Sequence, residues 1–281
     1  MQFTLTYENE NGDVLDLANN DNFILTDVDG LTAVDVDITT ATVALSDGTT
    51  ITNTRTEARE INLYLRFAQN ISVEAAKRAI LAVIKPAKKG TLYFDYNGRD
   101  VSIEVTTAAI TVPRFSESVI MQINLYAAKP YWTDAAAIVS EVSYFLGLFH
   151  FEMTVTSESP IVFGKILDVP IATVTNDGDA PTGITFNLVA VDDGIENPKI
   201  ERTADGAYFE LDGVTMNAGD QISIVTTRGQ KTVTKNGVNI INNVAAGSTW
   251  FQMEIGNNEF MVLDDSGGEI ETYIIYRRAF V

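Results

Sequence analysis

Short runs of β-branched and aromatic residues, separated by Asn-Gly or Asp-Gly pairs, form the main pattern along this chain. These pairs supply the positive φ angles that tight hairpin turns require. We expect a hairpin at each of four such pairs, namely Asp47-Gly48, Asn97-Gly98, Asp212-Gly213 and Asn236-Gly237. The pattern therefore predicts a mainly β protein.

One segment has helical rather than alternating periodicity. Apolar residues recur every three or four positions from Val73 to Ile84, with Ala76 and Ile80 at the centre of the apolar face. Ser72 is placed to cap the start, and Pro86 lies beyond the end. We expect one amphipathic helix here and strands elsewhere.

The order of these elements divides the chain into two domains. A strand is expected near Val119–Tyr126, and after Pro130–Trp132 the chain changes to an alanine-rich and then an apolar stretch. A new series of short strands begins near Asp168 and is about as long as one β-sandwich. We predict an N-terminal β domain with one helix at 1–132, a connector at 133–167 and an all-β domain at 168–281.

Charge excludes several classes of partner. The 281 residues include 38 acidic and 19 basic side chains, for a formal charge of −19. Stable non-specific binding to nucleic acid needs a basic surface, and this charge is repelled by anionic membranes. Cysteine is absent, and no Lys or Arg precedes Arg55, so we expect no disulfide and no secretory signal. No segment has the length and apolar composition expected of a membrane-spanning helix.

Residues for enzyme chemistry are few. The only histidine, His150, lies in an apolar stretch and is better explained as a structural residue of the connector than as a general base. No phosphate-binding glycine loop occurs. Carboxylates are abundant, so a glycosidase with a carboxylate pair is not excluded by content, but alternating Asp and Glu on strands are ordinarily solvated. We expect no enzymatic activity and no cofactor.

Two concentrations of aspartate provide the oxygen ligands that a calcium site needs. They consist of Asp27, Asp29, Asp35 and Asp37, and of Asp177, Asp179, Asp192 and Asp193. Neither has the spacing of a calcium-binding loop. Solvated acidic surfaces explain them better than a metal site.

The aromatic residues suggest a carbohydrate site, because lectins stack such rings on sugars. At strand spacing, however, aromatic side chains more often belong to a core. Trp250–Ile255 alternates as a strand with one buried face, followed by a turn at Gly256–Asn258. Nothing in this pattern indicates that Trp250 is exposed.

Several segments, in order over nearly the whole chain, resemble the distal tail proteins of siphophages. In the N-terminal part they are Arg59–Leu65, the helix that follows, Gly90–Phe94 and Ala128–Trp132. In the C-terminal part they are Asn176–Thr182, Asn197-Pro198, Ala218–Asp220, Ser248–Phe251, Gly256–Asn258 and Tyr276–Arg278.

The resemblance implies a structural protein at the virion tail tip, made in the cytoplasm of the bacterial host. Its N-terminal domain would form a homo-hexameric ring between the tail tube protein and the tail-tip hub protein, and DNA would pass through without specific binding. The C-terminal domain would be a galectin-like β-sandwich outside the ring. It lacks the galectin sugar motifs, because no His precedes Asn197-Pro198 and Phe251 follows Trp250. Docking of receptor-binding or baseplate proteins is then its expected task.

Two other functions stay open from the residues alone: a free-standing carbohydrate-binding adhesin of two β domains, and a polysaccharide hydrolase with paired carboxylates. For the tail protein, an asymmetry of charge suggests a subunit interface. Residues 1 to 54 have ten acidic side chains and no basic one. The helix region provides the basic residues Lys77, Arg78, Lys85, Lys88 and Lys89. We expect the acidic hairpin region of one copy to contact this basic end of the next, with a solvated helix end as the alternative.

Overall fold

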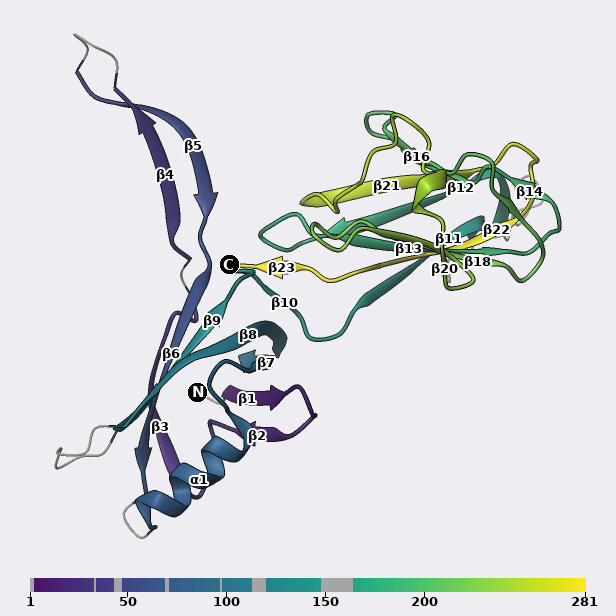
Figure 1. The fold of residues 1–281 in the computed structure, drawn as a ribbon. Coiled ribbons are helices and arrows are strands. Elements are labelled where there is room, and N and C mark those ends of the chain that lie inside the picture. The colour runs from purple at the N-terminus through teal and green to yellow at the C-terminus, as the bar shows by residue number, and fades with distance from the viewer. Residues whose placement is uncertain are drawn as a thin grey trace, which may run out of the picture. The chain divides into compact units, whose positions relative to one another are not determined.

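The computed structural model describes residues 3–32, 34–42, 47–68, 71–96, 98–112, 120–147 and 164–281. The chain divides into two compact units (Figure 1). Unit 1 comprises residues 1–135 together with 279–281, and unit 2 comprises residues 136–278. Both are mainly β, which confirms the predicted fold class.

Unit 1 is built on a nine-stranded sheet with the order β2-β1-β7-β8-β9-β6-β3, in which β10 pairs with both β8 and β23. Its elements are β1 (Phe3–Asn9), β2 (Val14–Asp16), β3 (Phe23–Asp29), β4 (Val36–Ala41), β5 (Thr50–Thr56), β6 (Arg59–Phe67), α1 (Val73–Val83), β7 (Lys89–Tyr96), β8 (Arg99–Thr111), β9 (Ile120–Ala127), β10 (Trp132–Asp134) and β23 (Ala279–Phe280). Strands β4 and β5 form a separate two-stranded sheet.

The core of unit 1 follows from strand alternation. In β6, Ile61, Leu63 and Leu65 are fully buried, and the residues between them are at least partly exposed. Ala76 and Ile80 of α1 belong to the same apolar cluster. Burial of these side chains stabilises the unit by about 1.5–3 kcal/mol for each large apolar residue.

Helix α1 occupies nearly the predicted range. It ends where the backbone N–H of Ile84 donates to Ile80 O at 2.8 Å, two residues before Pro86. The expected side-chain cap is wrong, because the Ser72 side chain makes no capping hydrogen bond. Glu74 in the first turn instead places a negative charge near the positive end of the helix dipole.

Unit 2 is a β-sandwich whose two layers share β11. Residues 138–142 of β11 pair with β22, and residues 143 and 145–147 pair with β12. The strands are β11 (Ile138–Gly147), β12 (Gly164–Asn176), β13 (Ile184–Ala190), β14 (Ile195–Glu196), β15 (Lys199–Arg202), β16 (Tyr208–Glu210), β17 (Thr215–Met216), β18 (Gln221–Val225), β19 (Thr232–Lys235), β20 (Val238–Asn239), β21 (Gly256–Leu263) and β22 (Ile270–Tyr276), with a 3-10 turn η1 (Ile241–Asn243). Phe186 packs edge-to-face on Phe251 and Phe260 in the core, with ring centroids 6.3 and 5.2 Å away.

Three of the four predicted hairpins are present. Strands β4 and β5 flank Asp47-Gly48, β7 and β8 flank Gly98, and β19 and β20 flank Asn236-Gly237. Asn97 lies outside the described residues. A hairpin at Asp212-Gly213 is wrong, because β16 pairs with β15 and β17 pairs with β14.

One further expectation differs from the structure. Trp250–Ile255 is not a strand: Phe251 and Met253 are buried, but Met253 makes only an isolated bridge to Thr182, and β21 begins at the expected turn. The predicted connector at 133–167 includes β11 and the start of β12. In the described part of the chain, no helix has the length and apolar character needed to cross a membrane.

Candidate functional site

The most exposed element of unit 1 is the hairpin of β4 and β5, which we call the arm. Figure 1 shows it extending away from the nine-stranded sheet. All six residues of β4 and the first six residues of β5 are exposed. An isolated two-stranded hairpin is at best marginally stable in water, so the arm is an element that benefits from a partner.

One face of the arm is apolar. Val36 and Ile38 lie two residues apart on β4 and therefore point to the same side, and Ile51 lies directly opposite Thr40, which shares that side. These three apolar side chains are 51, 53 and 60% exposed, respectively. We call Val36, Ile38 and Ile51 the apolar face of the arm.

The root of the arm is held by a buried arginine. Arg59 follows β5 closely and is only 2% exposed. Its Nη1 donates to Gly30 O at 2.8 Å and Leu31 O at 2.7 Å, and its Nε donates to Pro130 O at 2.7 Å. The indole N–H of Trp132 donates to Leu31 O at 3.0 Å. Burial lowers the pKa of Arg59, although a guanidinium stays charged in proteins.

Glycine is required at one position of this root. Gly30 has φ +83°, and a Cβ built there would lie 2.0 Å from the carbonyl oxygen of Glu60. No side chain fits so close to the backbone of β6. The chain entering the arm therefore lies directly against the strand that leaves it.

The five predicted interface residues belong to helix α1 and to the segment that follows it. Lys85 and Lys88 lie in the turn between α1 and β7, and Lys89 is the first residue of β7; all three are exposed, and we call them the basic corner. The turn is fixed by hydrogen bonds from Ala87 N to Thr107 O and from Thr107 N to Lys88 O, at 2.8 and 3.0 Å.

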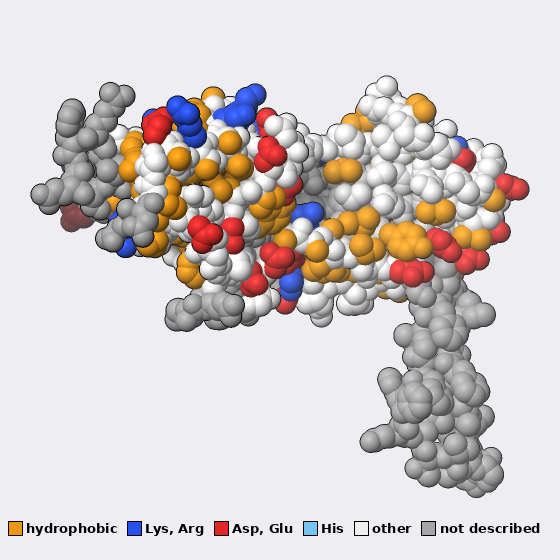
Figure 2. Space-filling view, turned by 90° about the horizontal axis from the view of Figure 1, so that it is seen from below, with side chains coloured by type: hydrophobic (Ala, Val, Ile, Leu, Met, Phe, Trp, Pro, Cys, Tyr) orange, Lys and Arg blue, Asp and Glu red, His pale blue; other side chains and the backbone are white. Residues whose placement is uncertain are grey.

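The other two lie on the helix itself. Lys77 is half-buried, and Arg78 is exposed with its Nε 3.5 Å from the Glu74 carboxylate. In Figure 2, Lys and Arg side chains (blue) lie near acidic side chains (red) on the part of the surface that belongs to unit 1. Figure 1 shows α1 and the described strands of the arm at opposite ends of unit 1.

The candidate chemical sites do not assemble in the described part of the chain. No group of three or more His, Asp or Glu side chains there is placed to hold a metal ion. Asp29 accepts a hydrogen bond from the Tyr64 hydroxyl at 3.2 Å instead. Trp250 is half-buried against Phe209, with ring centroids 4.9 Å apart. His150 lies outside the described residues.

Sequence reasoning missed one surface of unit 2. A hollow of about 400 Å³ lies on the outer face of the layer formed by β22, β13, β18 and β19. Its polar lining is Asn187, Gln221, Ser223, Thr234, Asn236 and Tyr273. The available signal was the strict alternation in β13, where polar Thr185 and Asn187 separate buried apolar residues.

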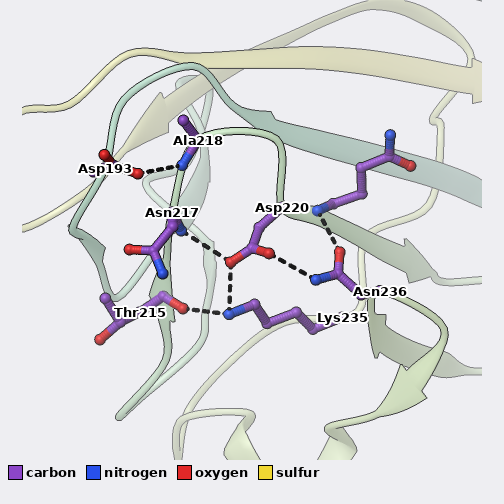
Figure 3. A network of polar contacts seen from close by, with 8 residues as sticks. Asp193, Thr215, Asn217, Ala218, Asp220, Lys235 and Asn236 are labelled. Carbon is purple, nitrogen blue, oxygen red and sulfur yellow. Dashed lines mark hydrogen bonds and ion pairs between the residues drawn. The ribbon is translucent and has the colours of Figure 1, made fainter.

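A hydrogen-bonded network supports one edge of this hollow (Figure 3). Asn236 donates to Asp220 at 2.7 Å and accepts from the backbone N–H of Gln221 at 2.9 Å. Lys235 Nζ lies 2.9 Å from the Asp220 carboxylate and donates to Thr215 O at 2.6 Å. A hydrogen bond from the Asn217 N–H, followed by those from Lys235 and Asn236, holds the pKa of Asp220 well below its usual range.

Comparison with protein families matches both units. Residues 10–127 match the phage tail protein RIFT-related domain, and residues 177–280 match the siphovirus-type tail component, C-terminal domain. The chain belongs to the siphophage distal tail proteins. As a distal tail protein it is a structural component of the virion tail tip.

Solved structures agree with this family at the level of the fold. The distal tail protein resembles the crystal structure of SPP1 Dit, described as a hub adsorption apparatus of phages that infect Gram-positive bacteria, with a TM-score of 0.72, 15% identity and full coverage of both chains. It also resembles chains of the phage P2 baseplate in the activated conformation. The calcium form gives a TM-score of 0.55 at 12% identity, covering 99% of this chain and 98% of that one. The strontium form gives 0.53 at 11%, covering 98% of each. No curated protein sequence matches significantly.

Proposed function

We propose that this distal tail protein forms a homo-hexameric ring that joins the tail tube protein to the tail-tip hub protein. Its role is structural rather than catalytic. SPP1 Dit is described as a hub adsorption apparatus, and the fold of this chain is similar over its whole length. The observation that carries the proposal is the arm, a separate hairpin that exposes an apolar face and whose described strands extend away from the nine-stranded sheet.

A ring explains the arm through a heterologous contact. In such a contact, two different surfaces of neighbouring copies meet, and a rotation that closes gives a ring. When Val36, Ile38 and Ile51 of one copy pack against the next copy, their exposed apolar area is removed from water. It also gives the isolated hairpin the packing that its two strands lack by themselves.

Charge shapes the passage of DNA through such a ring. Each copy carries a formal charge of −19, so a ring of six copies carries six times that negative charge. Acidic groups that line a channel repel the phosphates of a nucleic acid. DNA would therefore pass without specific binding, and unit 2 would remain available to dock receptor-binding or baseplate proteins.

Counting copies tests the ring directly. Six chains of 30.7 kDa each are expected in the ring at the tail tip, counted from the rotational symmetry of electron micrographs of purified tails. Light scattering of the isolated chain shows whether the ring closes without its neighbours. A tail tip with a different rotational symmetry would contradict the proposal.

The basic corner supplies the second half of the proposed contact. We infer that acidic residues of the arm region, such as Asp37 and Asp47, lie near Lys85, Lys88 and Lys89 of the next copy. Exposed ion pairs contribute only about 0.2–1 kcal/mol each and mainly steer association. Reversal of all three lysines to Glu should weaken ring formation at low salt and leave the melting of the single chain nearly unchanged.

Salt and position provide the controls for this variant. At about 1 M salt the Debye length is about 3 Å, so the difference from the parent should largely disappear. A matched variant carries the same reversal at Lys129, Arg228 and Lys231, which are also exposed. Equal ring formation by the basic-corner variant and the parent at low salt would remove this contact from the proposal.

A further inference from the structure

A row of polar side chains crosses four strands of unit 2 on one face. Tyr273 of β22 is directly opposite Asn187 of β13, Asn187 is directly opposite Ser223 of β18, and Ser223 is directly opposite Thr234 of β19. Direct partners in an antiparallel sheet point to the same side. The adjacent residues in these strands, including Phe186, Ile222 and Ile274, are buried in the core, so the row points outward.

The polar atoms of this row are available to a ligand. Within the described part of the chain, the side chains of Asn187, Ser223 and Thr234 make no hydrogen bond, although all three residues are half-buried. The Tyr273 hydroxyl reaches only Glu271, at 3.4 Å. The row forms the floor of the hollow of about 400 Å³, a volume within the range of small-ligand pockets.

The edge of the hollow is already held in place. Asn236 is fixed by hydrogen bonds with Asp220 and with the backbone of Gln221, as Figure 3 shows. The floor consists of strands in a continuous sheet. Such preorganisation lowers the ordering cost that binding must overcome.

The lining selects one class of ligand. It contains amides and hydroxyls, which both donate and accept hydrogen bonds, together with the Tyr273 ring and Val189 as apolar surface. No Lys, Arg or His lines the hollow, so a phosphate or carboxylate would have no cationic partner. A saccharide matches this pattern, since each of its hydroxyls donates and accepts and its C–H groups form an apolar face. We propose that the hollow of unit 2 binds a neutral saccharide.

This inference goes beyond the proposed ring and does not depend on it. The hollow lies wholly within unit 2, whereas the arm and the basic corner lie in unit 1. A saccharide can therefore bind to a single chain. Failure of ring assembly and failure of saccharide binding are separate results.

The test uses the isolated full chain with isotope-labelled backbone amides. Glucose, galactose, N-acetylglucosamine and rhamnose are titrated singly to about 10 mM, because a site of this size with a Kd of about 1 mM is then nearly saturated. At least one sugar should shift the amide signals of Asn187, Ser223 and Thr234. Thr234→Val, which keeps the side-chain shape, and Asn187→Leu should each weaken that sugar by about two- to tenfold.

A matched variant separates the hollow from the rest of the sheet face. Thr185 lies on the same strand and the same side as Asn187, is also half-buried and does not line the hollow, so Thr185→Val should bind like the parent. The proposal is overturned if none of the four sugars shifts the row. It is also overturned if Thr234→Val binds as tightly as the parent, or if glucose 6-phosphate binds more tightly than glucose.

Discussion

A single guanidinium connects three segments of unit 1 at the root of the arm. Arg59 donates to the carbonyls of Gly30, Leu31 and Pro130. The indole N–H of Trp132 donates to one of the same carbonyls, that of Leu31. The sequence predicts a strand at this position, and a charged strand residue is ordinarily solvated. It gives no sign that carbonyls from two distant loops converge there, which is why Arg59 could not be identified as a buried residue.

We expect Arg59→Met to destabilise unit 1 by about 2–4 kcal/mol, because buried carbonyls lose their donors and each costs about 1–3 kcal/mol. Urea unfolding followed by fluorescence measures this in a Trp250→Phe background, where Trp132 is the only reporter. Arg66→Met is the control, since Arg66 lies on the same strand but is exposed. A loss no larger than that of the control would show that the hydrogen bonds to Arg59 contribute little.

Another residue-scale prediction concerns pH. Asp205 accepts two hydrogen bonds from the Arg202 guanidinium, at 2.6 and 2.9 Å, and this contact lowers the pKa of Asp205 to about 2 from 3.8. Because the pKa is lower in the folded protein than in the unfolded chain, ionised Asp205 stabilises unit 2 above about pH 4. That contribution is lost as the pH falls through 2. Carbon NMR of the carboxyl group should show the low midpoint in the parent and a midpoint nearer 3.8 in Arg202→Met.

At the scale of elements, sequence patterns predict correctly those helices and turns that are formed by residues close together in the chain. The helix at Val73–Val83 and the hairpin at Asn236-Gly237 depend on residues next to one another, and both were predicted from sequence. Asn236 and Gly237 have the positive φ angles, 50° and 79°, that such a turn needs. Gly213 also has a positive φ, but its flanking strands pair elsewhere. Turn chemistry fixes a reversal of the chain and does not choose the partner strand.

The arm provides a prediction at the scale of one element. The double variant Ile38→Thr with Ile51→Thr should reduce ring formation, because the arm then has much less apolar area to bury against the next copy. Threonine keeps the strand propensity of these positions. The melting temperature of the single chain should change little, since both residues are more than half exposed.

Light scattering gives the mass of the particles as a function of protein concentration and so measures the loss of ring formation. The control is Thr39→Ala with Asn53→Ala, a directly opposed pair on the other face of the arm. If both double variants weaken the ring equally, the apolar face is not the contact surface.

At the scale of the whole molecule, unit 2 is inserted into unit 1. The chain leaves unit 1 after β10 and returns as β23, and the two strands pair antiparallel, with Trp132 opposite Phe280. Phe280 is 5% exposed and lies in the unit 1 core, with the Arg99 guanidinium 4.5 Å from its ring centroid. The sequence predicts an N-terminal domain that ends at residue 132, and it cannot reveal this return, because strands separated by a whole unit leave no periodic signal.

The insertion changes how ring formation by unit 1 alone should be tested. We expect a chain ending at residue 135 to be less stable than residues 1–135 joined to 279–281 by a short Gly-Ser linker. Loss of Phe280 alone should cost about 3–5 kcal/mol. Unfolding followed by Trp132 fluorescence compares the two chains. The linked chain should also form the ring, measured by light scattering, and self-association only of residues 136–278 would contradict this.

The pairing of β10 with β23 has a consequence for how such proteins diversify. Neighbouring strands lie about 4.8 Å apart, so the two ends of unit 2 leave unit 1 from almost the same point. Any domain whose own termini are close together fits that gap without moving a residue of the unit 1 sheet. Recombination between tail genes at the codons for residues 135 and 279 can therefore replace unit 2 as a cassette, giving a phage new surface contacts while the part of the protein that carries the arm is inherited unchanged.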